Sequence, residues 1–108
     1  MPPSNLIIRD TDTLQDAIAV IDANHYRSVI VVNEHDIVVG TLSDGDVRKS
    51  MLEHRLLSTP VHRVMNAHFI ALTPSEEGKA KGIFAEHHVF LIPIIDQNGQ
   101  LLDVLAAY

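Results

Sequence analysis

The sequence predicts an α+β fold made of two pseudo-symmetric units that pack together through their sheets. Two observations support this prediction. Along the 108 residues, the spacing of apolar positions changes from helical to extended in the same order twice. The two halves also align without a gap after a displacement of 63 positions, as from Ala17 to Ala80. Few identities survive this alignment, but the apolar pattern does, and so we expect an internal repeat.

Residues 13–25 are expected to form the first amphipathic helix. Apolar residues recur there at helical spacing, at Leu14, Ala17, Ile18 and Ile21. Thr13 and Asp16 are three positions apart, which is the pattern of a capping box at a helix start.

Two strands and a second helix complete the first unit. Residues 28–32, "SVIVV", are short and β-branched, as in a buried strand. Residues 33–36 are polar and form a turn, and residues 37–42, "IVVGTL", form a second strand antiparallel to the first. A helix is expected over residues 44–54.

The second half repeats this order, and each half is expected to form a β-α-β-β-α unit. Thr73, Pro74 and Glu76 are a good helix start, with a cap, a proline in the first turn and an acidic partner. Strands are expected at residues 90–96 and 101–107. We expect the following further elements: a helical turn at 61–65, a short strand near 69–72 and a turn at 97–100. The units are assigned to residues 1–58 and 59–108.

Composition excludes several classes of function. The net charge is −6, so a nucleic-acid surface or an anionic membrane surface is not expected. There is no cysteine, hence no disulfide frame and no thiolate nucleophile. No apolar run reaches the ~18 residues of a membrane span, and the start of the chain is not a signal peptide. The seven histidines lack a strong metal-ligand spacing, so they are expected at the surface or at interfaces.

The stretch "GTLSDGDVRKSM", residues 40–51, leads from a strand directly into a helix. If Ser43 caps this helix, the first amide groups are free to bind an anion such as a phosphate. Gly45 leaves room for close approach, and the carboxylate of Asp46 can accept hydrogen bonds from ribose hydroxyls. The alternative is an ordinary helix start, with an acidic residue that stabilises the helix dipole. A calcium loop would need further spaced oxygen ligands.

Residues 40–46, "GTLSDGD", match in full the signature of the CBS domain family, and the chain resembles a pair of CBS domains (a Bateman module). "VHRVMN" at 61–66 and "IPIID" at 92–96 resemble other family segments. The longer stretch 40–51 is similar to CBS pairs attached to bacterial sugar-phosphate nucleotidyltransferases and to arabinose-5-phosphate isomerases. Met1 lies close to the first repeat, which favours the nucleotidyltransferase. The last strand ends near Tyr108, so the second repeat is expected to be truncated.

The resemblance implies an adenine-nucleotide site in the cleft between repeats. Ser43 and the helix start would contact phosphate, and Asp46 would contact ribose. The implied ligand-binding residues are Ile8, Thr11, Tyr26, Arg27, Ser28, Thr41, Ser43, Asp44, Gly45 and Asp46. Arg27 could instead be a solvated surface residue, and Arg48 and Lys49 could meet phosphate or offset acidic neighbours. Ala106 takes the position of Ser43 in the second repeat, so the first repeat is favoured.

The resemblance therefore implies a regulatory module and not an enzyme. The expected ligand is AMP, ADP, ATP or S-adenosylmethionine, with no obligatory cofactor, no catalytic residue and no metal. An attached catalytic domain, a homodimer of modules and a cytoplasmic location are also expected. One alternative is a dimerisation or oligomerisation scaffold with a vestigial nucleotide site. The other is a small enzyme, but no activated nucleophile, metal cluster or general-base pair is evident.

Overall fold

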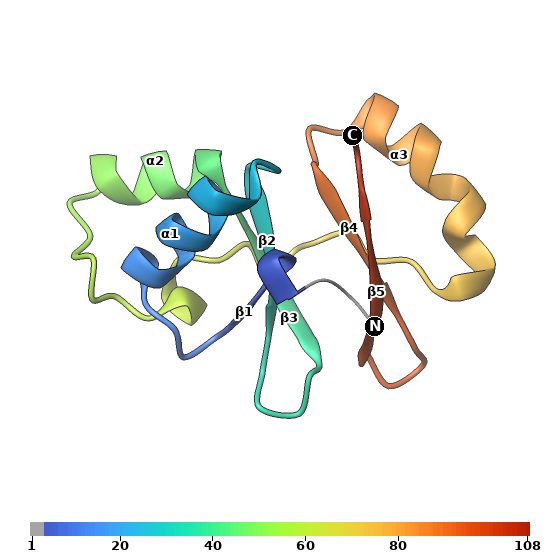
Figure 1. The fold of residues 1–108 in the computed structure, drawn as a ribbon, viewed down its shortest axis with the longest axis horizontal. Helices are drawn as coiled ribbons and strands as arrows, with labels where there is room; N and C mark the ends of the chain where they lie inside the picture. Colours follow the sequence, from blue (N-terminus) through green and yellow to red (C-terminus); the bar gives the residue numbers. More distant parts are fainter. Residues whose placement is uncertain (1–3) are drawn as a thin grey trace.

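The chain folds into a three-stranded sheet and a two-stranded sheet that face each other, with the helices on the outer sides (Figure 1). The computed structural model describes residues 4–108. This arrangement of helices and sheets confirms the predicted α+β class. The elements in chain order are η1 (Ser4–Leu6), β1 (Ile7–Arg9), α1 (Leu14–Asn24), β2 (Ser28–Val32), β3 (Val38–Ser43), α2 (Asp44–Leu52), η2 (Val61–Arg63), η3 (Pro74–Lys79), α3 (Ala80–Glu86), β4 (Leu91–Ile95) and β5 (Leu101–Ala106).

The first half is a β-α-β crossover followed by a hairpin. β1 pairs with β2 in parallel and α1 connects them, while β2 pairs with β3 antiparallel. Thr13 caps α1 as predicted: its hydroxyl accepts from the Asp16 amide, and the Asp16 carboxylate accepts from the Thr13 amide at 2.9 Å. The capping box of Thr73 and Glu76 also forms.

The pairing of residues in the two hairpins shows the internal repeat. In the first hairpin Ser28 pairs with Ser43, and in the second Leu91 pairs with Ala106, each displaced by 63 positions. All five Cα pairs of the two hairpins correspond in this way. Even the register shift recurs, between Val31 and Val32 in the first hairpin and between Ile94 and Ile95 in the second. The apolar pattern in the sequence therefore reflects two copies of one hairpin.

β2 is buried along its whole length and supplies apolar side chains to two cores. Toward the helices, Val29 and Val31 lie in a cluster with residues of α1. Toward the second half, Ile30 and Val32 share a cluster with Leu91 of β4 and Val104 of β5, which we call the intersheet core. Since both faces are covered, each position of "SVIVV" is buried, as the apolar run predicted. The intersheet core confirms packing through the sheets.

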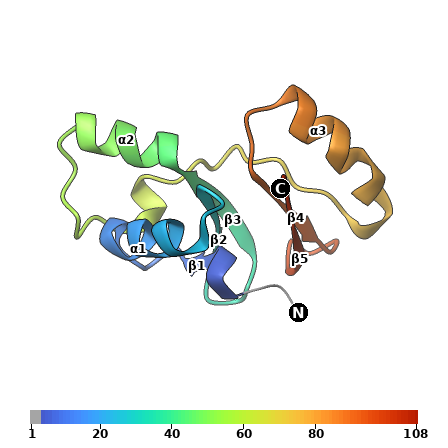
Figure 2. The same ribbon diagram turned by 45° about the horizontal axis from the view of Figure 1, so that its top comes forward.

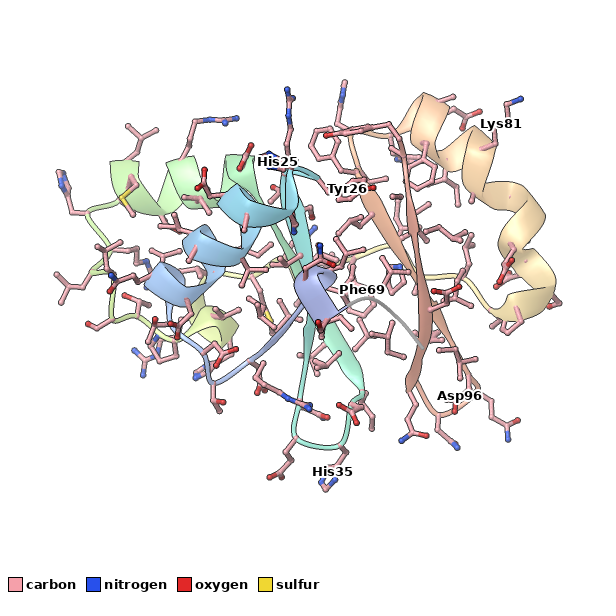
Figure 3. The ribbon with its side chains drawn as sticks, viewed as in Figure 1. His25, Tyr26, His35, Phe69, Lys81 and Asp96 are labelled. Carbon is pink, nitrogen blue, oxygen red and sulfur yellow. The ribbon has the colours of Figure 1, made fainter. Side chains whose placement is uncertain are left out.

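The tips of the two hairpins are hydrogen-bonded to each other. The Leu101 amide donates to the Asp36 carbonyl oxygen, and the Val38 amide donates to the Gly99 carbonyl oxygen, both at 3.0 Å. In Figure 3, His35 and Asp96 mark the two tips at the same end of the molecule. These bonds join the two halves at one end.

The second half departs from the predicted elements at two places. The helix after Thr73 begins as the 3₁₀ segment η3 and becomes α-helical only at Ala80, and α3 ends at Glu86, before the adjacent histidines. Residues 69–72 do not form a strand: the only pairing described there is a parallel bridge from Leu72 to Ile94. A single bridge pairs fewer backbone N–H and C=O groups than a strand does, and the rest of this short segment is irregular. Among residues 4–108, no helix has both the length and the apolar character needed to cross a membrane.

Gly40 is a position where a side chain would collide with a neighbouring segment. A Cβ atom there would lie 2.7 Å from the Met65 sulfur and 3.0 Å from the Asn66 carbonyl oxygen. We expect Gly40→Ala to lower the free energy of unfolding by about 1–3 kcal/mol, because it overpacks this contact. Urea denaturation measures the effect. Gly82→Ala is the matched control, since nothing lies within 4 Å of its added carbon, and it should not destabilise. Equal effects of the two substitutions would contradict this packing.

The capping box of α1 predicts a pH dependence of stability. Hydrogen bonds from the Thr13 amide, and then from its hydroxyl, hold the pKa of Asp16 below its usual value. A lowered folded-state pKa stabilises the fold above the unfolded-state pKa, and this contribution is lost as pH falls through the folded-state pKa. Asp16→Asn should therefore be less stable than the wild type at neutral pH, and the difference should shrink below about pH 4. Urea titrations across this range, with Asp22→Asn as control, would refute the assignment if the difference stayed constant.

Candidate functional site

A cavity of about 210 Å³ lies where the two halves meet, beside the start of α2. Four predicted site residues line it from the first half: Ser28, Thr41, Ser43 and Asp46. The opposite wall comes from the segment before η3 and from the start of β4, with residues Asn66, His68, Phe69, Ile70, His88, Val89, Phe90 and Leu91. Figure 3 shows Phe69 between the two sheets. The cavity thus has one polar wall and one largely apolar wall.

Ser43 and Asp46 on the polar wall form the N-terminal capping box of α2. The Asp46 Oδ2 atom accepts from the Ser43 amide at 2.9 Å and from the Ser43 hydroxyl at 3.0 Å. The Asp46 amide donates to the Ser43 hydroxyl oxygen at 3.3 Å. Among residues 4–108, the second carboxylate oxygen, Oδ1, accepts no hydrogen bond, so it keeps its capacity for a ligand.

The start of α2 is less free than the sequence predicts. The expectation was that its first amide groups have no protein acceptor. Instead, the Asp44 amide donates to the Arg27 carbonyl oxygen at 3.0 Å, and the Asp46 amide donates to Ser43. Ser43 and the loop between α1 and β2 therefore satisfy part of the helix terminus.

A pair of backbone hydrogen bonds fixes one rim of the cavity. The Thr41 amide donates to the Asn66 carbonyl oxygen at 3.0 Å, and the Asn66 amide donates to the Thr41 carbonyl oxygen at 2.7 Å. The Asn66 side-chain oxygen then accepts from the His68 amide at 2.9 Å, which closes a local turn. This turn carries the chain from the edge of β3 to His68 and Phe69 on the opposite wall.

The loop between α1 and β2 is anchored by a buried asparagine. Asn24 donates to the carbonyl oxygens of Asn5 and Ser28, both at 3.0 Å, and accepts from the Tyr26 amide at 2.7 Å. These bonds hold a loop in which His25 and Arg27 have a positive φ of 62°. The buried Ser28 hydroxyl donates to the Leu42 carbonyl oxygen at 3.2 Å, so Ser28 borders the cavity with its hydrogen already used.

Tyr26 and Arg27 join the two halves through aromatic contacts and do not line the cavity. The Tyr26 ring centroid lies 5.6 Å from that of Tyr108, and the Arg27 guanidinium carbon lies 5.7 Å from the centroid of Phe90. Figure 3 shows Tyr26 at the end of the molecule opposite His35. Arg27 therefore contacts Phe90 of the cavity wall, but neither Tyr26 nor Arg27 lines the cavity.

The remaining predicted residues lie elsewhere. Ile8 is buried in the core beneath α1, and Thr11 lies in the exposed turn after β1. Asp44 borders a separate surface hollow with Arg27, and Gly45 is exposed on α2 outside the cavity. The geometry thus brings Ser28, Thr41, Ser43 and Asp46 together at the cavity, whereas Ile8, Thr11, Asp44 and Gly45 do not line it.

The opposite wall is the part of the site that the sequence reasoning missed. Its residues 88–91 are the counterparts, 63 positions on, of residues 25–28, of which Tyr26, Arg27 and Ser28 were predicted from the resemblance. Because the two halves face each other, the motif of one unit meets the loops of the other. The internal repeat was the signal that could have pointed to residues 88–91. Among the described residues, no three histidine or acidic side chains gather as a metal site.

The chain is similar to known proteins over different parts of its length. The family model described as "CBS domain" matches residues 1–53. Among curated proteins, arabinose 5-phosphate isomerase GutQ of Salmonella typhi is 28% identical over 90 residues, which is 82% of this chain. An uncharacterized protein of Helicobacter pylori is 29% identical over 106 residues, 92% of the chain. The chain spans 28% and 31% of the length of these two relatives.

Solved structures share the fold over nearly the whole chain. The CBS domains of a transcriptional regulator from Streptococcus pneumoniae superpose with a TM-score of 0.81 at 22% identity, covering 98% of this chain and 87% of that one. A CBS domain protein from Pyrobaculum aerophilum, complexed with AMP, gives a TM-score of 0.77 at 18% identity, covering 98% and 81%. The similarity extends over both halves, so the arrangement of the two units is that of these CBS structures.

Asn24 should be essential for the loop beside the cavity. Asn24→Ala leaves the partly buried Tyr26 amide and two carbonyl oxygens without their partner, which should lower the free energy of unfolding by about 1–3 kcal/mol. Amide hydrogen exchange should also accelerate at residues 26–28. Asn98→Ala, in an exposed hairpin turn, is the control and should change neither quantity much. Unchanged exchange at residues 26–28 would show that Asn24 does not anchor the loop.

Proposed function

We propose that the chain binds an adenine nucleotide in the cavity beside α2 and thereby regulates an attached catalytic domain. Residues 1–53 match the CBS domain model, and the chain as a whole has the fold of a CBS domain pair. The observation that carries this proposal is the position of Asp46. Its carboxylate has one oxygen in the capping box and, within residues 4–108, one without a hydrogen-bond partner, and the opposite wall from the other unit includes the apolar residues Phe69, Ile70 and Val89.

The two walls suit the two ends of a nucleoside phosphate. The apolar wall, with Phe69, Ile70 and Val89, offers surface for the base. The Asp46 Oδ1 atom can accept hydrogen bonds from the neighbouring ribose hydroxyls. The Ser43 hydroxyl is the nearest group of the motif for the first phosphate, and to donate to it this hydroxyl must turn away from Asp46.

The size of the cavity supports a regulatory movement. At about 210 Å³ it is smaller than the roughly 300–1,000 Å³ of ordinary ligand pockets. A nucleotide would therefore have to widen it. The hairpin tips are hydrogen-bonded at one end of the halves, and at the other end Tyr26 contacts Tyr108 (Figure 3). Widening the cavity would therefore have to loosen one of these connections and so change the angle between the halves. A ligand that favours the wider state would shift this equilibrium and so bias an attached domain.

The attached domain in this proposal acts on a sugar phosphate. The stretch 40–51 resembles the CBS pairs attached to sugar-phosphate nucleotidyltransferases and to arabinose-5-phosphate isomerases, and the curated relative GutQ is named as an arabinose 5-phosphate isomerase. The module itself supplies no catalytic group in this proposal. Two such modules would associate as a homodimer, as expected from the resemblance.

A second candidate is an oligomerisation scaffold whose nucleotide site is vestigial. The specific observation in its favour is that Ser43 and Asp46 already satisfy each other in the capping box. In the second repeat, Ala106 replaces the hydroxyl residue. The scaffold would bind no nucleotide, whereas the regulatory module would bind at least one.

Calorimetric titration with AMP, ADP, ATP and S-adenosylmethionine tests the proposal directly. In Asp46→Ala, the affinity for the ligand that binds best should fall by about 1.5–3 kcal/mol, because a hydrogen bond to a charged group is lost. Asp16→Ala is a matched control, since Asp16 has the same capping role in α1 and lies outside the cavity.

The control should lose stability but keep its affinity. If Asp46→Ala and Asp16→Ala bind equally well, the ribose assignment is wrong. If no heat appears with any of the four ligands, the scaffold is the correct description.

A further inference from the structure

A second hollow, of about 490 Å³, adjoins the nucleotide cavity along the side of α2. It shares Asp46, Asn66 and His68 with that cavity, so the two spaces adjoin at these residues. We call this hollow the α2 groove. Its charged and titratable lining residues are Asp46, Lys49, Glu53, Arg55, Arg63 and His68.

The helix geometry explains why the groove begins at Asp46. Residues 46, 49, 50 and 53 follow the i, i+3, i+4, i+7 spacing that places side chains along one helix face. The facing wall is the segment from Arg63 to His68, whose path is fixed by the Thr41–Asn66 bonds. Figure 2 shows the chain passing from η2 beside β3 toward the second half. A ligand in the nucleotide cavity would therefore meet this groove at Asp46.

The groove gathers cations in an acidic chain. Three of the eight Lys and Arg residues line it, although the net charge of the chain is −6. Among residues 4–108, Lys49 and Arg63 form no ion pair, and Arg55 has only a contact of 4.0 Å between its Nε atom and Glu53 Oε1. Lys49 and Arg63 are both exposed, so they are free to bind a dissolved anion. Of the two acidic lining residues, Asp46 accepts hydrogen bonds in the capping box and, in our proposal, from ribose, while Glu53 contacts Arg55.

We propose that the α2 groove binds the phosphates of a nucleoside polyphosphate beyond the first one, with Lys49 and Arg63 as the principal contacts. This inference rests on the proposed function, because the nucleoside must occupy the adjoining cavity. Phosphate oxygens form strong charge-assisted hydrogen bonds with both side chains, and arginine can bind them in a bidentate manner. The groove thus makes the site prefer ATP over AMP.

The test compares AMP, ATP and inorganic tripolyphosphate by calorimetry at neutral pH, with EDTA present so that the phosphates keep their full charge. Wild type should bind ATP about tenfold more tightly than AMP. The double variant Lys49→Gln/Arg63→Gln should lose about three- to tenfold in ATP affinity and less than twofold in AMP affinity, because exposed charge contacts are individually modest. Lys79→Gln/Lys81→Gln is the control: it removes the same charge from the η3–α3 segment, outside the groove, and Figure 3 shows Lys81 at the outer side of α3.

The control should leave the ratio of ATP to AMP affinity unchanged, and added salt should weaken ATP binding more than AMP binding. Equal wild-type affinities for ATP and AMP would overturn the inference while leaving the proposed function intact, and so would equal losses in the double variant. Tripolyphosphate that binds as tightly as ATP would also overturn it, since the groove would then be an anion site independent of nucleoside. Absence of binding by both AMP and ATP overturns this inference, and it rejects the proposed function as well if ADP and S-adenosylmethionine also give no heat.

Discussion

The intersheet core is the constraint on which the rest of the structure depends. Ile30 and Val32 of β2 are buried on the side that faces β4, and they share one apolar cluster with Leu91 and Val104. Neither unit covers this face alone, since the second sheet has only two strands. Burying it forces the two units to face each other. The motif at the start of α2 consequently meets residues 88–91 of the opposite unit, and the candidate site exists only between them.

The same few groups serve stability and, in our proposal, binding. Ser43 and Asp46 form the capping box of α2, and the site needs the hydroxyl of one and a carboxylate oxygen of the other. A ligand that recruits the Ser43 hydroxyl must replace the hydrogen bond to Asp46 with one of comparable strength. A phosphate oxygen can do so, because hydrogen bonds to ionised acceptors are the stronger ones. Because the Ser43 hydroxyl bonds either to Asp46 or to the ligand, the ligand-free and ligand-bound states would differ little in free energy.

The sequence predicted the parts of the fold that have a periodic pattern. The displacement of 63 positions anticipated the paired registers of both hairpins, and the capping boxes at Thr13 and Thr73 were readable from residue types alone. The short strand near residues 69–72 was wrong, because one bridge to Ile94 does not extend into a ladder. Of the two walls of the candidate site, the sequence predicted residues of the first-half wall only. Ser43 and Asp46 lie at the cavity, but Ile8 and Thr11 do not, because the facing unit supplies the opposite wall. That pairing depends on tertiary packing, which local patterns do not encode.

If an adenine nucleotide binds in the cavity between the units, titration of the ¹⁵N-labelled chain with AMP should change amide chemical shifts at the residues of both walls. Changes are expected at residues 43–46 and, from the other unit, at 68–70 and 88–91, with the hairpin tips at 33–36 and 96–100 nearly unchanged. Changes confined to one unit, or centred on the hairpin tips, would contradict binding in this cavity.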